Sequence, residues 1–360
     1  MRKTALLLIL AMLAAVLTSC GSVASAPAAA ETETVKETEA PTEKYSGYIF
    51  DAFDTVITVT AYCADQESFD ALMDTARSEF MRWHRMCDIY FSYPGLNDLR
   101  TVNENAGKEP VEVPPELMEL LRFAGEMYAL TDGKVNVAMG SVLKLWHDAR
   151  EFANVMPEQA RLPDMSALTE AAKHCDIDDL LLDGAAGTVL LRDSAMSLDV
   201  GAIAKGYGTE RVCETLKKLG FDRFVINAGG NVRCCGDKPG GAPWVVGVTN
   251  PIPNESVSLG TVEVRDRSVV TSGAYQRFFT LDGRRYHHII DGETLMPEER
   301  YLSVTVITGD SGYADAMSTA LFNMDIDEGL RFVEAQDDLE AMWVLADGTQ
   351  RFSANFQLND

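Results

Sequence analysis

Residues 196–231 read MSLDVGAIAKGYGTERVCETLKKLGFDRFVINAGGN, in which two strand patterns enclose a helix pattern. Met196–Asp199 and Phe224–Asn227 are short, mostly apolar runs of the kind found in strands. Between them, Gly201–Gly206 leads into a helix that we expect to end at Gly220, a residue type common at helix C-termini. The order strand, turn, helix, strand indicates a helix that lies on a sheet.

The flanking sequence continues this alternation in both directions. Asp51–Tyr62 is rich in β-branched residues and predicts a strand. Two helices are expected next, one over 66–90 with Phe69, Leu72, Ala76, Phe80 and Trp83 on its apolar face, and one after Pro114-Pro115. Further strands are expected at 188–191, 244–249, 258–264, 275–280, 286–290 and 302–307, followed by a helix over 313–335 and a terminal hairpin. We predict an α+β fold, a single domain with a large, mostly antiparallel sheet and flanking helices.

The composition excludes some classes of partner. The chain has 360 residues, 46% hydrophobic and 24% charged, which is ordinary for a globular protein. Its 31 Lys and Arg against 55 Asp and Glu give a net charge of −24. Nucleic acid is therefore not an expected partner, because its binding depends on basic surface that releases counterions. A local basic pocket for one nucleotide is still compatible with this charge.

The N-terminus has the pattern of an export signal. Arg2 and Lys3 precede the apolar run Ala5–Leu17, which is shorter than a membrane-spanning helix. The following Leu17-Thr-Ser-Cys-Gly21 resembles a bacterial lipobox, which implies lipidation of Cys20 and a location on the outer face of the cell membrane. An ordinary signal peptide is the alternative. We expect a signal peptide at 1–20, a flexible acidic tether at 21–44 and the folded domain at 45–360.

The other cysteines do not suggest a metal site. Cys63, Cys87, Cys175, Cys213, Cys234 and Cys235 include no C-x-x-C pair and no zinc-type spacing. The adjacent Cys234 and Cys235 invite the idea of a disulfide, although two small buried apolar residues is the better interpretation.

Two glycine-containing segments have residues suited to phosphate. In Ser197–Gly206, a strand delivers Asp199 and a helix begins beside Lys205. Free amides at a helix N-terminus favour an anion, and a lysine adds positive charge. The segment matches neither the P-loop nor the dinucleotide fingerprint, and a tight packing turn explains it as well. Asn227–Asn231 opens a glycine turn that permits close backbone approach to a ligand, as an ordinary turn also does.

Two further segments have acid–base and metal-binding groups. His288 follows the polar run Thr271–Gln276 and precedes Asp291, and its imidazole is the natural general base. Asp315 and Thr319 are four residues apart on a predicted helix, so their oxygens share one face and suit Mg²⁺. The spacing alone favours another interpretation, in which Asp315 caps the helix and Thr319 bonds back to a carbonyl.

Taken together, these segments resemble the ApbE family, the FAD:protein FMN transferases. The resemblance runs from about residue 50 to 325, nearly the whole predicted domain. In family order it comprises Phe53-Asp54-Thr55, Phe91–Tyr93 with Asn103, Asp132–Asn136 leading to Leu145-Trp146, Ser197–Gly206, Ile226–Asn231, Thr271–Gly273, His288–Asp291 and Ala314–Ala320. It implies an ApbE-like, T-fold-like domain.

The resemblance also implies roles for matching residues. Asp315, Thr319 and the main-chain carbonyl of Ala202 would hold Mg²⁺, and His288 occupies the position of the family's proposed base. Seven residues fall where the family contacts FAD, namely Phe53, Tyr93, Lys134, Asn136, Asp199, Lys205 and Ile290. The chain departs from the family pattern at Val135 and Asn136, where many members have an aromatic residue and an acid. It also lacks the proline and final glycine expected after Asp291.

The activity implied is transfer of FMN from FAD to a Thr or Ser hydroxyl of another protein, with release of AMP. Family acceptors are membrane-linked redox subunits with a motif like Asp-Gly-x-Ser/Thr-Gly-Ala-Thr, which this chain lacks. Two alternatives remain open at this point. One is an exported FAD pyrophosphatase that yields FMN and AMP, and the other is a flavin-binding lipoprotein without catalysis.

Overall fold

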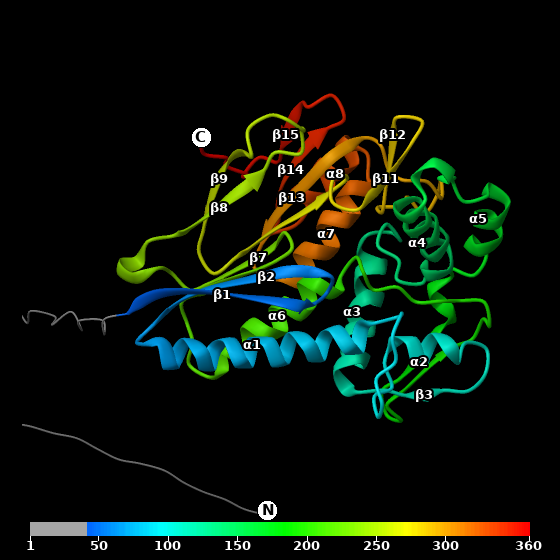
Figure 1. Cartoon of the computed structure of the whole chain (residues 1–360), viewed down its shortest axis with the longest axis horizontal. Coiled ribbons are helices and arrows are strands. Elements are labelled where there is room, and N and C mark those ends of the chain that lie inside the picture. The colour runs from blue at the N-terminus through cyan, green and yellow to red at the C-terminus, as the bar shows by residue number, and fades with distance from the viewer. Residues whose placement is uncertain (1–41) are drawn as a thin grey trace, which may run out of the picture. The chain divides into compact units, whose positions relative to one another are not determined.

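An eight-stranded sheet runs through residues 42–360, the part of the chain that the computed structural model describes (Figure 1). Every neighbouring pair of its strands is antiparallel, which confirms the predicted α+β fold with a mostly antiparallel sheet. In spatial order the strands are β1 (Glu43–Ala52), β2 (Thr55–Cys63), β6 (Phe224–Ala228), β7 (Asn231–Cys235), β10 (Ser268–Gly273), β13 (Tyr301–Thr308), β14 (Glu340–Leu345) and β15 (Gln350–Phe352). The predicted signal 1–20, Cys20 and nearly all of the predicted tether 21–44 lie outside the described residues.

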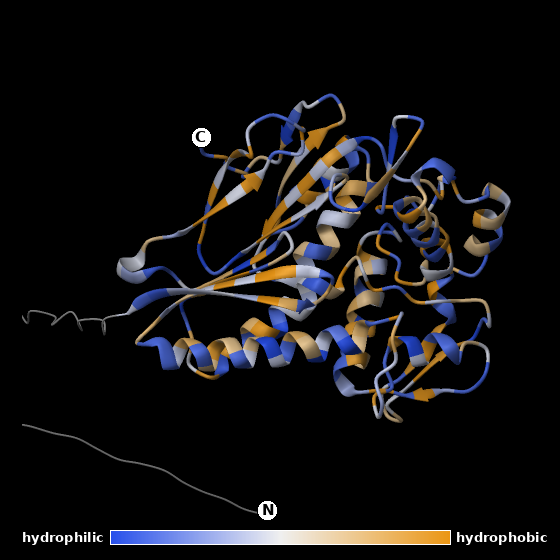
Figure 2. Ribbon diagram, viewed as in Figure 1, coloured by the Kyte–Doolittle hydropathy of each residue, from blue (hydrophilic) through white to orange (hydrophobic). Residues whose placement is uncertain are grey.

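Helices cover one face of this sheet. They are α1 (Gln66–Cys87), α6 (Ala204–Lys218), α7 (Ser311–Asn323) and α8 (Ile326–Glu334). The stripe predicted for the first helix is buried, because Phe69, Leu72, Ala76, Phe80 and Trp83 are each at most 5% exposed. Figure 2 shows hydrophilic and hydrophobic residues mixed along α1, as expected for a helix with one face toward solvent.

A two-stranded layer packs on the opposite face. It consists of β8 (Trp244–Thr249) and β9 (Ser258–Val264), whose Trp244 and Val262 contribute to an apolar cluster with Cys234 of the sheet. The adjacent Cys235 belongs instead to the core on the helix side, because successive residues of a strand point to opposite faces. Both thiols are free and buried, in agreement with the prediction of two small apolar residues.

The remaining elements lie together on the right of Figure 1. One group consists of α2 (Leu99–Glu104), α3 (Pro115–Leu130) and the small sheet of β3 (Val111–Glu112), β5 (Thr188–Leu191) and β4 (Leu180–Asp183). Another consists of α4 (Gly140–Val155), α5 (Met165–Ala172) and the hairpin of β11 (Phe278–Leu281) and β12 (Arg284–His287). Within residues 42–360, no helix is both long and apolar enough to cross a membrane.

The first predicted strand is in fact the turn and two arms of a hairpin. Phe53 and Asp54 have φ of 55° and 50°, the left-handed values that a tight two-residue hairpin turn requires. The strand expected over Asp51–Tyr62 is therefore divided between β1 and β2. Its N-terminal arm begins at Glu43, two residues before the start expected for the folded domain at 45.

Two other predicted elements also differ. Met196–Asp199 is not a strand, since only Ser197 pairs, in a single parallel bridge with Met139. The helix expected over 313–335 is two helices, because Asp325 accepts a hydrogen bond from the Glu328 N–H and starts α8 as its N-cap. The helix predicted to end at Gly220 does so, as α6 ends at Lys218 and Gly220 has φ of 93°.

Helices α6 and α7 cross unusually closely, and glycine makes this possible. A Cβ on Gly206 would lie 2.2 Å from the carbonyl oxygen of Ser311, and one on Gly312 would lie 3.0 Å from the Cα of Tyr207. Each helix also accepts a main-chain hydrogen bond from the first turn of the other. Asp315 on α7 accepts from the Gly206 N–H at 2.8 Å, and Glu210 on α6 accepts from the Ser311 N–H at 2.7 Å. These two carboxylates satisfy amides that a helix leaves free at its start.

We predict that Gly206→Ala destabilises the protein by about 1–3 kcal/mol, the usual effect of overpacking a tight contact. The measurement is urea unfolding followed by circular dichroism. Gly125→Ala is the control, because its Cβ would meet no heavy atom within 4 Å and alanine favours the helix. Equal stability of the two variants would show that the α6–α7 crossing is not as tight as described.

Candidate functional site

The crossing of α6 and α7 carries a buried acid. Asp315 is 3% exposed, and its Oδ1 lies 3.6 Å from the Nζ of Lys205, whose side chain is 25% exposed. Burial raises the pKa of the Asp315 carboxyl, while the Lys205 charge, the Gly206 N–H and the Asn231 side chain act in the opposite direction. A buried carboxylate with one cation at this distance is incompletely compensated, so the site favours a further positive charge.

Asp315 does not cap its own helix, so the alternative that spacing favoured is wrong in that respect. The N-cap of α7 is Asp310, which accepts from the Tyr313 N–H, and Asp315 caps the start of α6 instead. Thr319 follows one turn later on α7 and is partly exposed. The side chain between them, Ser318, bonds to the Asp315 carbonyl at 2.9 Å and to Ser272 of β10 at 2.8 Å.

The oxygen ligands present suit a hard divalent cation. Helix α7 supplies the carboxylate of Asp315 and the hydroxyl of Thr319. The main chain near Ala202 lies just before the start of α6. Among residues 42–360 no three His, Cys, Asp or Glu side chains gather to bind a metal. A Mg²⁺ ion needs no such cluster, because it keeps waters and takes phosphate oxygens from a substrate. The buried and incompletely compensated Asp315 carboxylate is the observation that fits this ion.

A glycine turn and a hairpin turn border the acid. Asn231 begins β7, and its buried side chain lies by the Asp315 carboxyl, whose pKa it lowers. The preceding Gly229 and Gly230 have φ of 60° and 99°, and a Cβ on Gly229 would lie 2.2 Å from Thr55 Oγ1. The glycines therefore allow the β6–β7 turn to pack against the β1–β2 hairpin, and the close approach of this turn to a ligand stays a prediction.

His288 lies among cations. Burial, and after it the charges of Arg277, His287, Lys205 and Arg150, lower its pKa to about 3. Its Nδ1 is buried without a hydrogen-bond partner among the described residues. The imidazole is therefore neutral at physiological pH, with a lone pair free to accept a proton.

Asp199 lies at the start of the turn before α6. Its Oδ1 accepts from the Gly201 N–H at 2.8 Å, and burial raises the pKa of its carboxyl while His147, Arg277 and Arg150 oppose the rise. His147 in turn stacks on Tyr90, with ring centroids 4.8 Å apart, and lies 3.0 Å from a guanidinium nitrogen of Arg150. Asp199 thus faces a group of aromatic and basic side chains.

Four residues of this group were not predicted. Arg150 and His147 lie on α4, a helix that the sequence reasoning did not identify, and Tyr90 is three positions from the expected Tyr93. Arg277 donates to the Phe53 carbonyl at 3.5 Å and directly follows the polar run 271–276. This position directly after residues 271–276 was the sequence signal from which Arg277 could have been predicted.

The structure gives the remaining predicted residues other partners. Phe53 is in the hairpin turn and packs edge-on against Phe80, with its carbonyl held by Arg277. Tyr93 donates to Asp88 at 2.7 Å, and the guanidinium of Arg85 lies 5.7 Å from its ring centre.

Lys134, Asn136 and Ile290 lie around α4. Lys134 pairs with Glu293 at 2.6 Å, and Asn136 donates to the Cys175 carbonyl at 2.9 Å. Ile290 is 6% exposed and belongs to the apolar cluster under α4. Lys134 and Ile290 thus lie at the turn after His288, whereas the side chain of Asn136 is held by the segment after α5.

Comparison with known proteins is consistent with this arrangement. The model of the ApbE family matches residues 53–343. The FAD:protein FMN transferase of Klebsiella pneumoniae (strain 342) is 34% identical over 244 residues, 68% of this chain and 73% of the relative. That of Treponema pallidum (strain Nichols) is 35% identical over 270 residues, 71% of this chain and 73% of the relative. The crystal structure of the ApbE protein of Thermotoga maritima aligns with a TM-score of 0.77 at 28% identity, over 87% of this chain and 98% of that one.

The low pKa of His288 has a consequence for stability. In the unfolded chain the histidines have their ordinary pKa of about 6.5. Between about pH 6.5 and 3 the unfolded chain therefore binds a proton at residue 288 that the folded protein does not bind. Stability therefore falls as the pH falls through that range. We predict that, between pH 7 and 4.5, the free energy of unfolding falls by roughly 1–2 kcal/mol less in His288→Gln than in the unaltered protein. This figure allows for solvent screening.

Urea unfolding at the two pH values measures this difference. His174→Gln is the control, since His174 is paired with Asp193 at 2.6 Å and lies apart from the cations around His288. The same loss of stability in both variants would contradict a neutral, buried His288.

Proposed function

Since the chain belongs to the ApbE family and is a flavin transferase, we propose that it moves FMN from FAD to a Thr or Ser hydroxyl of another protein and releases AMP. The observation that carries this proposal is the buried carboxylate of Asp315. It projects from α7 to the first turn of α6, where the Nζ of Lys205 lies 3.6 Å from it. A pyrophosphate would meet the positive charge of Lys205 there. The acid of Asp315 and the hydroxyl of Thr319, four residues later on α7, are the side chains that we propose as ligands for a cation.

We propose Asp315, Thr319 and the carbonyl of Ala202 as the Mg²⁺ ligands. When bound, the ion would neutralise phosphate charge and stabilise the AMP that leaves. Lys205 would hold the phosphates, and Asp199 fixes the turn before α6 by accepting the hydrogen bond of the Gly201 N–H. Phe53, Tyr93, Lys134, Asn136 and Ile290 remain proposed FAD contacts on the strength of family position.

His288 is the proposed base. Its imidazole accepts the proton of the incoming hydroxyl, whose oxygen forms a bond to the phosphorus that bears riboflavin. The bond from that phosphorus to the bridging oxygen breaks, and AMP departs with the electron pair. A pKa of about 3 makes a weak base in the free protein. Phosphates would neutralise Arg277 and Lys205, two of the charges that depress it, so FAD binding should make His288 more basic.

Water could replace the hydroxyl, and the product would then be free FMN and AMP. The acceptor therefore decides between a transferase and an FAD pyrophosphatase. Incubation with FAD and Mg²⁺, with and without a redox subunit that contains Asp-Gly-x-Ser/Thr-Gly-Ala-Thr, separates the two outcomes. Covalent flavin fluorescence in a denaturing gel supports transfer, while free FMN formed equally in both arms supports hydrolysis. A protein that binds FAD regardless of EDTA and makes neither product would be a passive receptor.

In this assay we predict that Asp315→Asn lowers transfer at least about 100-fold, since a metal ligand contributes several kcal/mol to the reaction. His288→Ala should bind FAD normally and transfer slowly. Asp325→Asn is the control, because it alters an exposed acid that caps α8 and asparagine caps equally well. Full activity of Asp315→Asn would remove this residue from the metal site. A His288→Ala variant that only binds FAD more weakly would refute its role as base.

We also propose that Cys20 is lipidated and anchors the protein on the outer face of the cell membrane. The support is the sequence pattern at residues 17–21 and the polar, acidic stretch that follows. Cys20→Ser should abolish labelling by radioactive palmitate and move the protein from the membrane fraction to the soluble exported fraction. Cys87→Ser should keep both properties. Membrane retention of the Cys20→Ser protein would overturn the anchor.

A further inference from the structure

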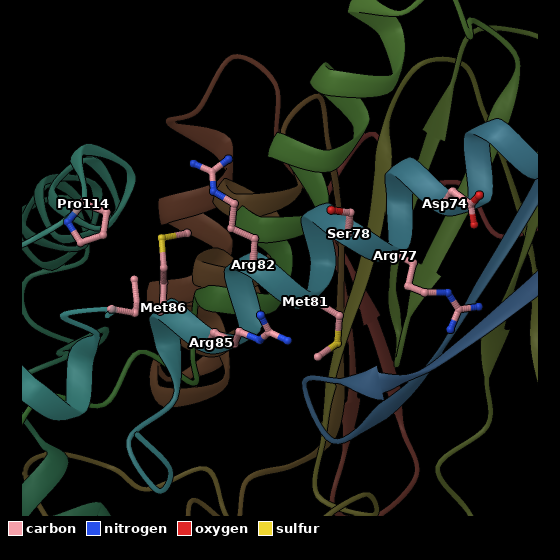
Figure 3. Close-up of a pocket in the computed structure, with 9 residues that line it drawn as sticks. Asp74, Arg77, Ser78, Met81, Arg82, Arg85, Met86 and Pro114 are labelled. Atoms are coloured by element: carbon pink, nitrogen blue, oxygen red, sulfur yellow. The ribbon is translucent and has the colours of Figure 1, made fainter. Parts of the chain in front are cut away.

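A groove of about 710 Å³ lies along α1, away from the Asp315 carboxylate. Figure 3 shows that most of its lining side chains follow one another along α1, from Asp74 to Met86. Pro114, at the start of α3, lies beyond the Met86 end. Three arginines, Arg77, Arg82 and Arg85, border it. The volume is in the range of binding sites rather than of packing defects.

The charge of the groove is opposite to that of the protein. The chain has a net charge of −24, yet the groove contains three arginines and one acid, Asp74. Arg82 is neutralised by Glu79 and Glu116. Arg77 donates only to the Tyr48 carbonyl at 3.4 Å, and within residues 42–360 neither Arg77 nor Arg85 forms an ion pair. Two cations are thus left for a negatively charged partner.

The spacing of these cations favours an extended partner. Arg77 and Arg85 are eight residues apart on one helix, which separates them by about 12 Å along its axis. An extended peptide covers that length in roughly four residues. Met81 lies between the two arginines on α1, and Met86 and Leu96 add apolar surface to the groove beyond Arg85. Methionine adapts to side chains of different shape, so an acidic segment with an apolar residue between its charges is complementary.

The far end of the groove is next to the catalytic region. Leu96 belongs to the loop between α1 and α2, residues 88–98, and Tyr93 of this loop lies under Arg85. Tyr90 of the same loop stacks on His147, which acts electrostatically on Asp199. One short loop therefore separates the groove from the site proposed for FAD.

We propose that this groove binds an acidic, partly apolar segment of the acceptor protein and so brings the acceptor hydroxyl to bound FAD. This proposal rests on the proposed function. A membrane surface is less complementary to this groove than a peptide is. A flat layer of lipid headgroups contacts cations that protrude from a protein, whereas these arginines border a groove. Basic surface that matches an acidic partner mainly raises the rate of encounter, and salt screens it.

The test is the variant Arg77→Glu, which reverses one of the two cations left for a partner and leaves Arg85 above Tyr93. The acceptor is the redox subunit with Asp-Gly-x-Ser/Thr-Gly-Ala-Thr, followed by in-gel flavin fluorescence. We expect the KM for that subunit to rise at least about 10-fold, with kcat and FAD affinity unchanged and a weaker dependence on salt. Arg351→Glu is the control, since Arg351 is exposed on β15, the edge strand opposite β1.

An unchanged KM in a folded Arg77→Glu variant, its fold confirmed by circular dichroism, overturns the proposal. So does loss of binding to phosphatidylglycerol vesicles with an unchanged KM, which would assign the groove to lipid. If the unaltered protein binds FAD but labels no subunit, the proposed function fails and the groove proposal fails with it. Normal labelling by the unaltered protein with an unchanged KM in the variant refutes the groove alone.

Discussion

Two carboxylates that reach between crossing helices hold this site together. Asp315 of α7 accepts from the first turn of α6, and Glu210 of α6 accepts from the first turn of α7. Glu210 is fixed in turn by Arg233, a buried residue of β7 whose Nε lies 2.9 Å from it. Because glycine alone permits this approach at Gly206, the distance between the helices is set by main-chain contact. The sheet, the two helices and the acid are thereby locked in one arrangement.

This arrangement gives an acidic protein a local site for anions. The net charge is −24, yet Lys205, Arg277 and Arg150 all act on His288. The cations come from the start of α6, the segment before β11 and α4, which are far apart in sequence. A polyphosphate that enters would neutralise them, restore basicity to His288 and supply oxygens to a cation at Asp315. Substrate binding and acid–base function are thus coupled by charge.

The sequence predicted those features that depend on local pattern. The apolar stripe of α1, the C-terminal glycine of α6 and the glycine turn before β7 follow from periodicity and turn chemistry. The hairpin at Phe53 and Asp54 was missed, because phenylalanine rarely adopts positive φ and no glycine follows Asp54 to mark the turn. Arg150 and His147 were missed because contacts of α4 depend on tertiary packing. The cap that Asp315 provides to another helix has no signature in residue spacing.

Cation binding by Asp315, together with the phosphates of FAD, is the step on which the proposed function depends. Electron paramagnetic resonance of Mn²⁺, which can replace Mg²⁺ at oxygen sites, tests it directly. Titration of Mn²⁺ into the protein with saturating FAD should remove the free-ion signal at one equivalent. The same titration of a folded Asp315→Asn protein should leave most of the ion free. Equal binding of Mn²⁺ by the two proteins would contradict the account.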